Sequence, residues 1–153
     1  MYKKQHALLH EFIEAAASGD IETVNKLVEL PSIDAGIITR AFKKASEYGH
    51  VDIVERLLHE DGVKPDAQFN WAIRVAAANN HVKLVDRLLQ DSRIDPTARS
   101  NWALVRAAER GHEAVVERLL KVPEVDAGAR GNWFVFCFER EEMRRRIWRQ
   151  ETA

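Results

Sequence analysis

The sequence is poor in cysteine and in residues that interrupt helices. Its 153 residues include one cysteine, Cys137, together with seven glycines and four prolines. A single cysteine excludes an internal disulfide framework and a cysteine-rich zinc site. No apolar run is as long as a membrane-spanning helix, and no signal-peptide pattern follows Met1. These features predict a cytoplasmic protein. The cytoplasm in which it acts could be that of a host cell.

An excess of charge of one sign is also missing. The 23 basic residues balance 24 acidic ones, so no overall field attracts nucleic acid or an anionic membrane surface. We therefore expect neither as a partner. The remaining composition, 46% hydrophobic and 31% charged, is typical of a folded chain that is long enough to form one continuous core.

What the sequence does contain is repetition at a period of about 31 residues. The pair Asn-Trp begins at residues 70, 101 and 132, and the string Val-Glu/Asp-Arg-Leu-Leu begins at residues 54, 85 and 116. His50, His81 and His112 keep the same register. Agreement of whole stretches at one spacing identifies a repeat protein.

Each unit has the pattern of a helix, a tight turn, a second helix and a loop. Apolar residues at helical spacing predict the first helix pair within residues 7–28, with a break at Gly19. Thr39, Asn70 and Asn101 are the expected N-caps of the later first helices. Because one unit alone buries too little apolar surface, the units are expected to stack into a single domain of residues 1–153. The predicted repeats span residues 7–38, 39–69, 70–100 and 101–131.

The last segment departs from the repeat. Residues 133–138 read Trp-Phe-Val-Phe-Cys-Phe, and a highly charged stretch follows up to residue 149. We expect one capping helix over residues 132–149 that covers the open end of the fourth repeat, because a terminal repeat has one face in water. Cys137 is expected to be buried and unreactive in this run.

The repeated lines resemble the ankyrin repeat. The segments that carry the likeness are Ala76-Ala77-Ala78-Asn79-Asn80-His81 and Ala107-Ala108-Glu109-Arg110-Gly111-His112, each followed by an aliphatic stripe that ends in Leu-Leu. The likeness covers residues 7–132, although the units are about two residues shorter than usual and lack the Thr-Pro-Leu-His opening. It implies an all-α, ankyrin-like α-solenoid of about four helix-turn-helix repeats with a C-terminal capping helix.

The sequence contains little that indicates a metal site or a catalytic site. The three register histidines would lie on the order of 10 Å apart in a stack of helices, whereas zinc needs ligands that converge on one ion. We expect their imidazoles to form hydrogen bonds near the turn between the two helices. The sequence has no glycine-rich phosphate loop or nucleophile elbow. The prediction is a protein that is not an enzyme, with no catalytic residues, no cofactor and no metal.

The resemblance implies that a protein partner is bound through loop tips and the concave face of the first helices. Loop-tip positions include Ile38, Phe69, Arg99 and Arg130. The tryptophans at the helix starts have two interpretations, packing between repeats or an aromatic binding stripe. The candidate partner-binding residues are Tyr48, Phe69, Trp71, Asn79, Arg99, Trp102, Arg110 and Arg130.

Two alternatives from other classes remain open. Ankyrin-like arrays often accompany catalytic domains, so the chain is also compatible with a targeting domain of a larger enzyme or effector. A structural oligomer formed through residues 133–138 is the other alternative. We expect a monomer rather than an oligomer.

Overall fold

The computed structural model describes residues 2–125 of the chain, and this part is entirely helical. It contains eight helices and no strand, as predicted for an α-solenoid. The predicted capping helix over residues 132–149 lies outside the described residues. The helices are α1 Tyr2–Ser18, α2 Ile21–Val28, α3 Ala35–Tyr48, α4 Val51–Leu58, α5 Ala67–Ala78, α6 Val82–Leu88, α7 Ala98–Glu109 and α8 Glu113–Leu120.

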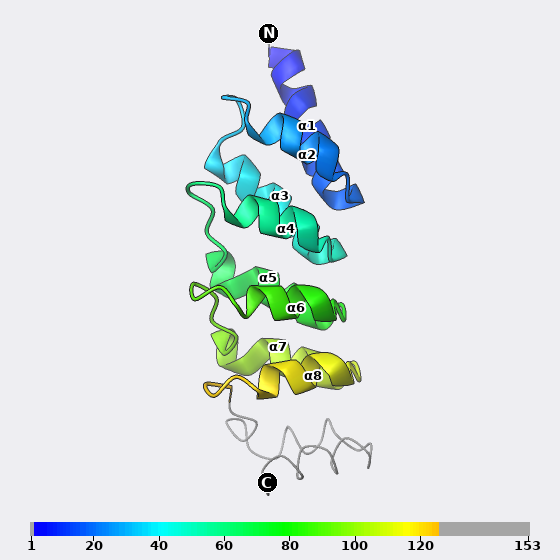
Figure 1. The fold of residues 1–153 in the computed structure, drawn as a ribbon, viewed down its shortest axis with the longest axis vertical. Helices are drawn as coiled ribbons and strands as arrows, with labels where there is room; N and C mark the ends of the chain where they lie inside the picture. The colour runs from blue at the N-terminus through cyan, green and yellow to red at the C-terminus, as the bar shows by residue number, and fades with distance from the viewer. Residues whose placement is uncertain (1, 126–153) are drawn as a thin grey trace, which may run out of the picture.

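The helices form antiparallel pairs that stack along one axis. In Figure 1 the second helices of the pairs, α2, α4, α6 and α8, form one layer, and the first helices, α1, α3, α5 and α7, lie behind them. Each helix packs on its pair partner and on the equivalent helix of the next repeat, with more extensive contacts between the first helices. The long axis of the molecule is therefore the axis of repetition, as in a solenoid.

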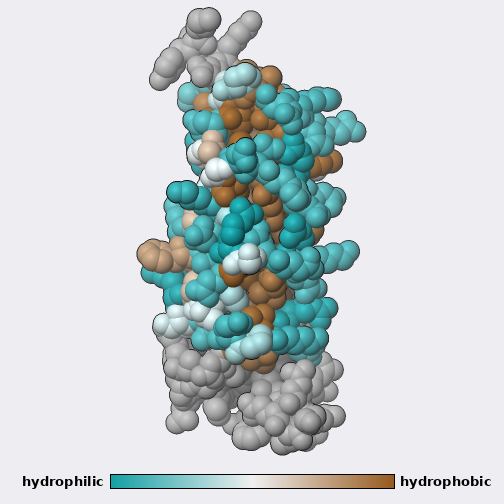
Figure 2. Space-filling model, turned by 60° about the vertical axis from the view of Figure 1, so that its left-hand side comes forward, coloured by the Kyte–Doolittle hydropathy of each residue, from teal (hydrophilic) through white to brown (hydrophobic). Residues whose placement is uncertain are grey.

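One register position in the first helices carries the largest core residues. Phe12, Phe42, Ile73 and Leu104 are all at most 1% exposed. Burying a side chain of this size stabilises the fold by about 1.5–3 kcal/mol. The buried residues of all repeats form a single cluster, and a hydrophobic band follows the loop side of the stack between hydrophilic flanks (Figure 2).

Small residues let the two layers approach one another. Ala45, Ala76 and Ala107 occupy one position and are fully buried. Ser46, where the neighbouring repeats have a second alanine, is also fully buried, and its hydroxyl donates to the Phe42 carbonyl at 2.8 Å. The serine is tolerated because its only polar side-chain group has a partner.

The start of α3 differs from the prediction. The helix begins at Ala35 with Asp34 as its N-cap, whose carboxylate accepts a hydrogen bond from the Ile37 amide at 2.9 Å. Thr39 is therefore not a cap but lies one turn inside the helix, where its hydroxyl donates to the Ala35 carbonyl. Ile38, predicted at a loop tip, is 5% exposed in this helix. The prediction placed Ile37 in a loop, but its amide belongs to the first turn of α3, where it is satisfied by the Asp34 carboxylate.

Asn70 and Asn101 are not N-caps either. Each is the last of three consecutive residues with left-handed backbone angles, residues 68–70 and 99–101, with φ between 53 and 59°. The regular helix continues from the tryptophan that follows. The Asn70 side-chain oxygen accepts a hydrogen bond from the Asp95 amide at 2.8 Å, in the loop that leads from α6 to α7. This asparagine therefore joins the turn at the start of α5 to the loop before the next repeat, and its amide side chain also tolerates the left-handed conformation.

Candidate functional site

The register histidines link successive repeats. The Nε2 atoms of His50, His81 and His112 lie 2.9, 2.8 and 3.0 Å from carbonyl oxygens at the end of the first helix of the repeat before. The predicted hydrogen bonding near the turns is thus confirmed. Gly49 has φ of 79°, and a Cβ there would lie 2.6 Å from Nδ1 of His81, so the glycine makes room for the next repeat's imidazole.

Two of the predicted binding residues reinforce these links. Asn79 and Arg110 occupy the same register position, two residues before the histidine. The Asn79 side chain donates to the Glu47 carbonyl at 3.0 Å, and an Arg110 Nη1 donates to the Ala78 carbonyl. Both side chains are exposed, yet each already holds two repeats together. A substitution at either position therefore changes stability as well as surface chemistry.

Tyr48 occupies that register position in the repeat before and makes different contacts. It is 54% exposed, and its ring stacks on His50 with 6.4 Å between ring centroids. The ammonium group of Lys44 lies 5.8 Å from the tyrosine ring centroid. Among the three equivalent positions, this one presents an aromatic ring to solvent.

The predicted tryptophans lie between core and surface. Trp71 and Trp102 are half-buried, and each has a cation from the preceding first helix over its ring. The Lys43 ammonium lies 5.9 Å from the Trp71 centroid, and the Arg74 guanidinium carbon lies 4.9 Å from the Trp102 centroid. Each ring packs against the neighbouring repeat, as the packing interpretation requires. Each ring also borders the surface of the first helices, as the binding-stripe interpretation requires.

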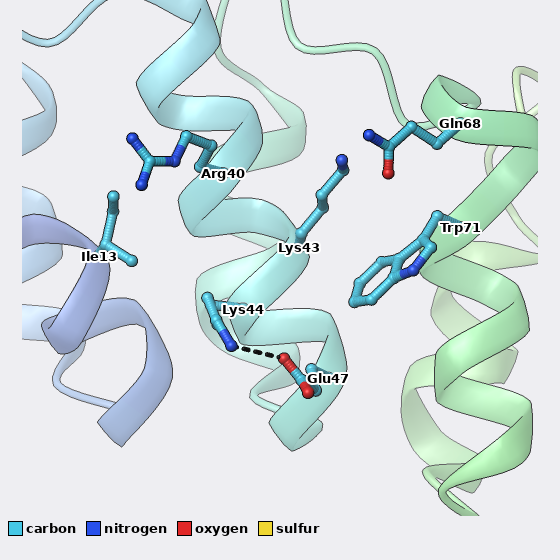
Figure 3. Close-up of a pocket in the computed structure, with 7 residues that line it drawn as sticks. All are labelled: Ile13, Arg40, Lys43, Lys44, Glu47, Gln68 and Trp71. Atoms are coloured by element: carbon cyan, nitrogen blue, oxygen red, sulfur yellow. Dashed lines mark hydrogen bonds and ion pairs between the residues drawn. The ribbon is translucent and has the colours of Figure 1, made fainter.

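Trp71 also borders a pocket of about 290 Å³ on that surface. Figure 3 shows its residues on three helices, with Ile13 on α1, Arg40 and Lys43 on α3, and Gln68 beside Trp71 on α5. Lys43 points toward α5 and Arg40 toward α1. Neither cation has a carboxylate partner among the described residues. Lys44 and Glu47 complete the lining and pair with each other at 2.9 Å. The pocket therefore combines an aromatic wall with two cations, Arg40 and Lys43, that are available to an acidic group.

Phe69 and Arg99 lie on the two left-handed turns. Phe69 is 70% exposed, and the Arg99 guanidinium carbon lies 5.5 Å from its ring centroid. A left-handed conformation costs about 1–2 kcal/mol per residue for most side chains. The positive φ of Phe69, 57°, is an outlier for a bulky side chain, and the ring that this turn carries is exposed to solvent.

The two layers of helices differ in how their charges are balanced. On the second helices, an arginine of one repeat pairs with a carboxylate of the repeat before it. These pairs are Arg56–Glu29, Arg87–Glu55 and Arg118–Asp86, with N–O distances of 2.7, 3.3 and 2.7 Å. The arginine of the recurring Glu/Asp-Arg pair therefore forms an inter-repeat ion pair in three successive repeats, and in the last two its partner is the acidic residue of the pair before.

On the first helices, basic side chains predominate. Among residues 6–125, whose side chains the structure describes, only Lys44 and Arg106 of this layer form ion pairs, with Glu47 and Glu109 at 2.9 and 2.8 Å. The local excess of positive charge was not visible in the balanced overall composition. Helices α3, α5 and α7 carry six basic residues, Arg40, Lys43, Lys44, Arg74, Arg99 and Arg106, and two acidic residues, Glu47 and Glu109.

The structure therefore brings four of the eight predicted residues to one side. Phe69, Trp71, Arg99 and Trp102 lie along the first helices and the turns that precede them. Arg130 lies outside the described residues. Sequence analysis did not identify the cations that accompany them. A signal was present, because Lys43 and Arg74 share one register position, 31 residues apart.

Two features are absent from the described part of the chain. Between residues 2 and 125, no cluster of three or more histidine, cysteine or carboxylate side chains is arranged to hold a metal ion. No helix in the same range is both long enough and apolar enough to cross a membrane.

Comparison with known proteins agrees with this architecture. The family model for three copies of the ankyrin repeat matches residues 12–100 and 42–131. A comparison with curated proteins finds no match. Ankyrin repeats are generally protein–protein interaction modules, and the family is typically non-catalytic. With most of its length matched and its helices stacked in four pairs, the chain belongs to the ankyrin repeat family.

Proposed function

We propose that the chain binds an acidic segment of a protein partner on the face formed by α3, α5, α7 and the turns before α5 and α7. We call this the first-helix face. The observation that carries the proposal is the excess of cations on these helices, beside an exposed phenylalanine. Opposite charges across an interface steer encounter and set specificity, and aromatic and arginine side chains dominate interface energetics.

The contrast between the layers supports this choice of face. The arginines of α4, α6 and α8 each pair with a carboxylate of the repeat before. By comparison, Arg40, Lys43 and Arg99 have no carboxylate partner among the described residues, and the pocket beside Trp71 offers an aromatic wall. A partner with glutamate or aspartate beside an apolar side chain would complement both features. We propose that this partner is a cytoplasmic protein.

The test uses a substitution that the next repeat already contains. Phe69→Ser introduces the residue found at the equivalent position, Ser100, which has the same left-handed backbone. Because Phe69 is 70% exposed, the free energy of unfolding is expected to change by less than about 0.5 kcal/mol. Lys83→Ala, an exposed position on α6, is the matched control on the other layer.

The partner is captured from a lysate of the native cell with the wild-type protein, identified, and then titrated against purified variants. Phe69→Ser and the double variant Arg40→Gln/Lys43→Gln are expected to weaken binding at least about tenfold, as for loss of interface anchors. Added salt should weaken the wild-type complex as well. Equal affinity of these variants and Lys83→Ala would show that the partner binds elsewhere.

A further inference from the structure

Arg74 is a buried cation without a compensating carboxylate. Its side chain lies on the first-helix face, but the residue is only 8% exposed. The Nε atom is fully buried and has no hydrogen-bond partner, and no carboxylate within residues 2–125 forms an ion pair with it. Burial, with the charge of Arg99 as the second cause, lowers the pKa of this guanidinium. A charge removed from water in this way is costly until it is paired.

The side chains around Arg74 add positive charge instead of neutralising it. Arg74 and Arg106 both lie over the Trp102 ring, with guanidinium carbons 4.9 and 5.2 Å from the ring centroid. The Arg99 guanidinium lies over the Phe69 ring on the turn at the start of α7, and its positive charge contributes to lowering the pKa of Arg74. Glu109 pairs with Arg106 alone. Two guanidinium groups thus share the Trp102 ring, and the carboxylate of Glu109 pairs with one of them, Arg106.

The repeat before has the same arrangement in a weaker form. Lys43 occupies the register position of Arg74, and its ammonium lies over Trp71, but Lys43 is only half-buried and forms no arginine cluster. Gln68 stands at the position of Arg99. The arginines of the later repeat are therefore not required by the fold, since the same backbone is built with lysine and glutamine.

We propose that Arg74, Arg99 and Arg106 bind a phosphorylated side chain of the partner, with Trp102 as the wall of the site. The proposal rests on the function proposed above and names one group of the partner. The Nε donor of Arg74 has no partner, and the side chains of Arg99 and Arg106 are exposed. A phosphoryl group carries nearly two negative charges and three acceptor oxygens.

A phosphoryl group fits better than a single carboxylate. Planar guanidinium groups bind its oxygens in forked pairs, and clusters of arginine are the usual means of recognising phosphorylated segments. One carboxylate carries a single charge and two oxygens, which leaves part of a three-arginine site unneutralised. The difference between these two ligands is therefore measurable with small probes, without knowledge of the partner.

The probe is N-acetyl-O-phosphoserine amide, added to the full chain at constant ionic strength. The Nε–H resonance of Arg74 in ¹H–¹⁵N spectra is expected to shift in a saturable manner, and the melting temperature to rise by about 3 °C at a probe concentration ten times Kd. N-acetylglutamate amide is expected to have little effect at the same concentration. No response to the phosphorylated probe, or equal responses to both, would overturn the proposal.

Substitutions separate the site from folding. Arg74→Met keeps the apolar stem and removes the uncompensated charge, so it should raise the melting temperature of the free protein and abolish the response to the probe. A lower melting temperature for this variant would contradict the unpaired charge on which the site depends. Lys83→Met is the matched control, with wild-type melting and response.

A second variant keeps the test informative if Arg74→Met folds poorly. Arg99→Gln introduces the residue that Gln68 provides in the equivalent turn, and should weaken probe binding about threefold with unchanged melting. Unchanged binding would count against the three-arginine site. Loss of the probe response is independent of partner capture through Phe69, so failure of this proposal and failure of the proposed function are distinguishable.

Discussion

Asn70 offers the sharpest test of how the repeats are joined. Its side-chain oxygen accepts the Asp95 amide at 2.8 Å, and its backbone has φ of 58°. Replacing it with alanine removes a hydrogen bond that contributes about 1 kcal/mol. It also places a residue with a Cβ, but without the asparagine amide, in a left-handed conformation at a cost of about 1 kcal/mol. The expected loss in free energy of unfolding for Asn70→Ala is about 2 kcal/mol.

Asn70→Gly separates the two contributions. Glycine adopts positive φ without steric cost, so this variant loses the hydrogen bond to the next loop and is expected to cost about 1–1.5 kcal/mol. An N-cap role predicts another pattern, because glycine in place of an asparagine cap costs only a few tenths of a kcal/mol. Urea titration followed by far-ultraviolet circular dichroism measures both variants, with an unchanged m-value as the control for two-state unfolding. A loss of only a few tenths for Asn70→Gly would refute the inter-repeat hydrogen bond.

Three other contacts are open to measurement. His50→Ala should lower the free energy of unfolding by about 1–2 kcal/mol, and by more than His81→Ala, because the carbonyl bound by His81 keeps a second donor. Equal losses in urea titrations would contradict this. Gly49→Ala should cost about 2 kcal/mol or more, since φ is 79° and the new Cβ meets the imidazole of His81; an unchanged melting temperature would show that the contact can relax. Hydrogen bonds from Arg93 hold the pKa of Asp91 below its ordinary value of 3.8. This stabilisation is present above the unfolded-state pKa and is lost as the pH falls through the lower folded-state pKa. The stability difference between wild type and Asp91→Asn should therefore be largest near neutral pH and vanish in acid, and a difference that does not depend on pH would contradict it.

The residue pattern did not predict that α3 begins directly at a short loop, whereas α5 and α7 begin with left-handed turns. Ile33 and Ala41 are separated by one residue fewer than Val63 and Ala72 in the next repeat. In the shorter connection the chain enters the helix directly at Asp34, whereas in the longer one three left-handed residues take up the extra length. A pattern of residue types does not distinguish these paths, because the choice depends on where the next repeat holds the loop.

The aromatic and basic face was predicted only in part. Phe69, Trp71, Arg99 and Trp102 stood out as residues at turns and helix starts, and they lie on one side of the stack. Arg74 did not stand out, since arginine on a helix is ordinarily solvated. Arg74 is distinctive because it is buried and because no carboxylate among the described residues pairs with it. Both properties depend on which residues lie close to it in the folded protein.

The sequence by itself determined the number of described helix pairs, the residues of the core and the role of the register histidines. The physical reason is that each unit contacts only its neighbours, so residues at one register position meet the same environment in every repeat. Phe12 and Phe42 in the core, and His50 and His81 at the turns, follow from that rule. Tertiary structure alone decided which polar side chains between repeats are satisfied. Those partners lie about 30 residues apart in the chain, and small changes in loop path decide which of them meet.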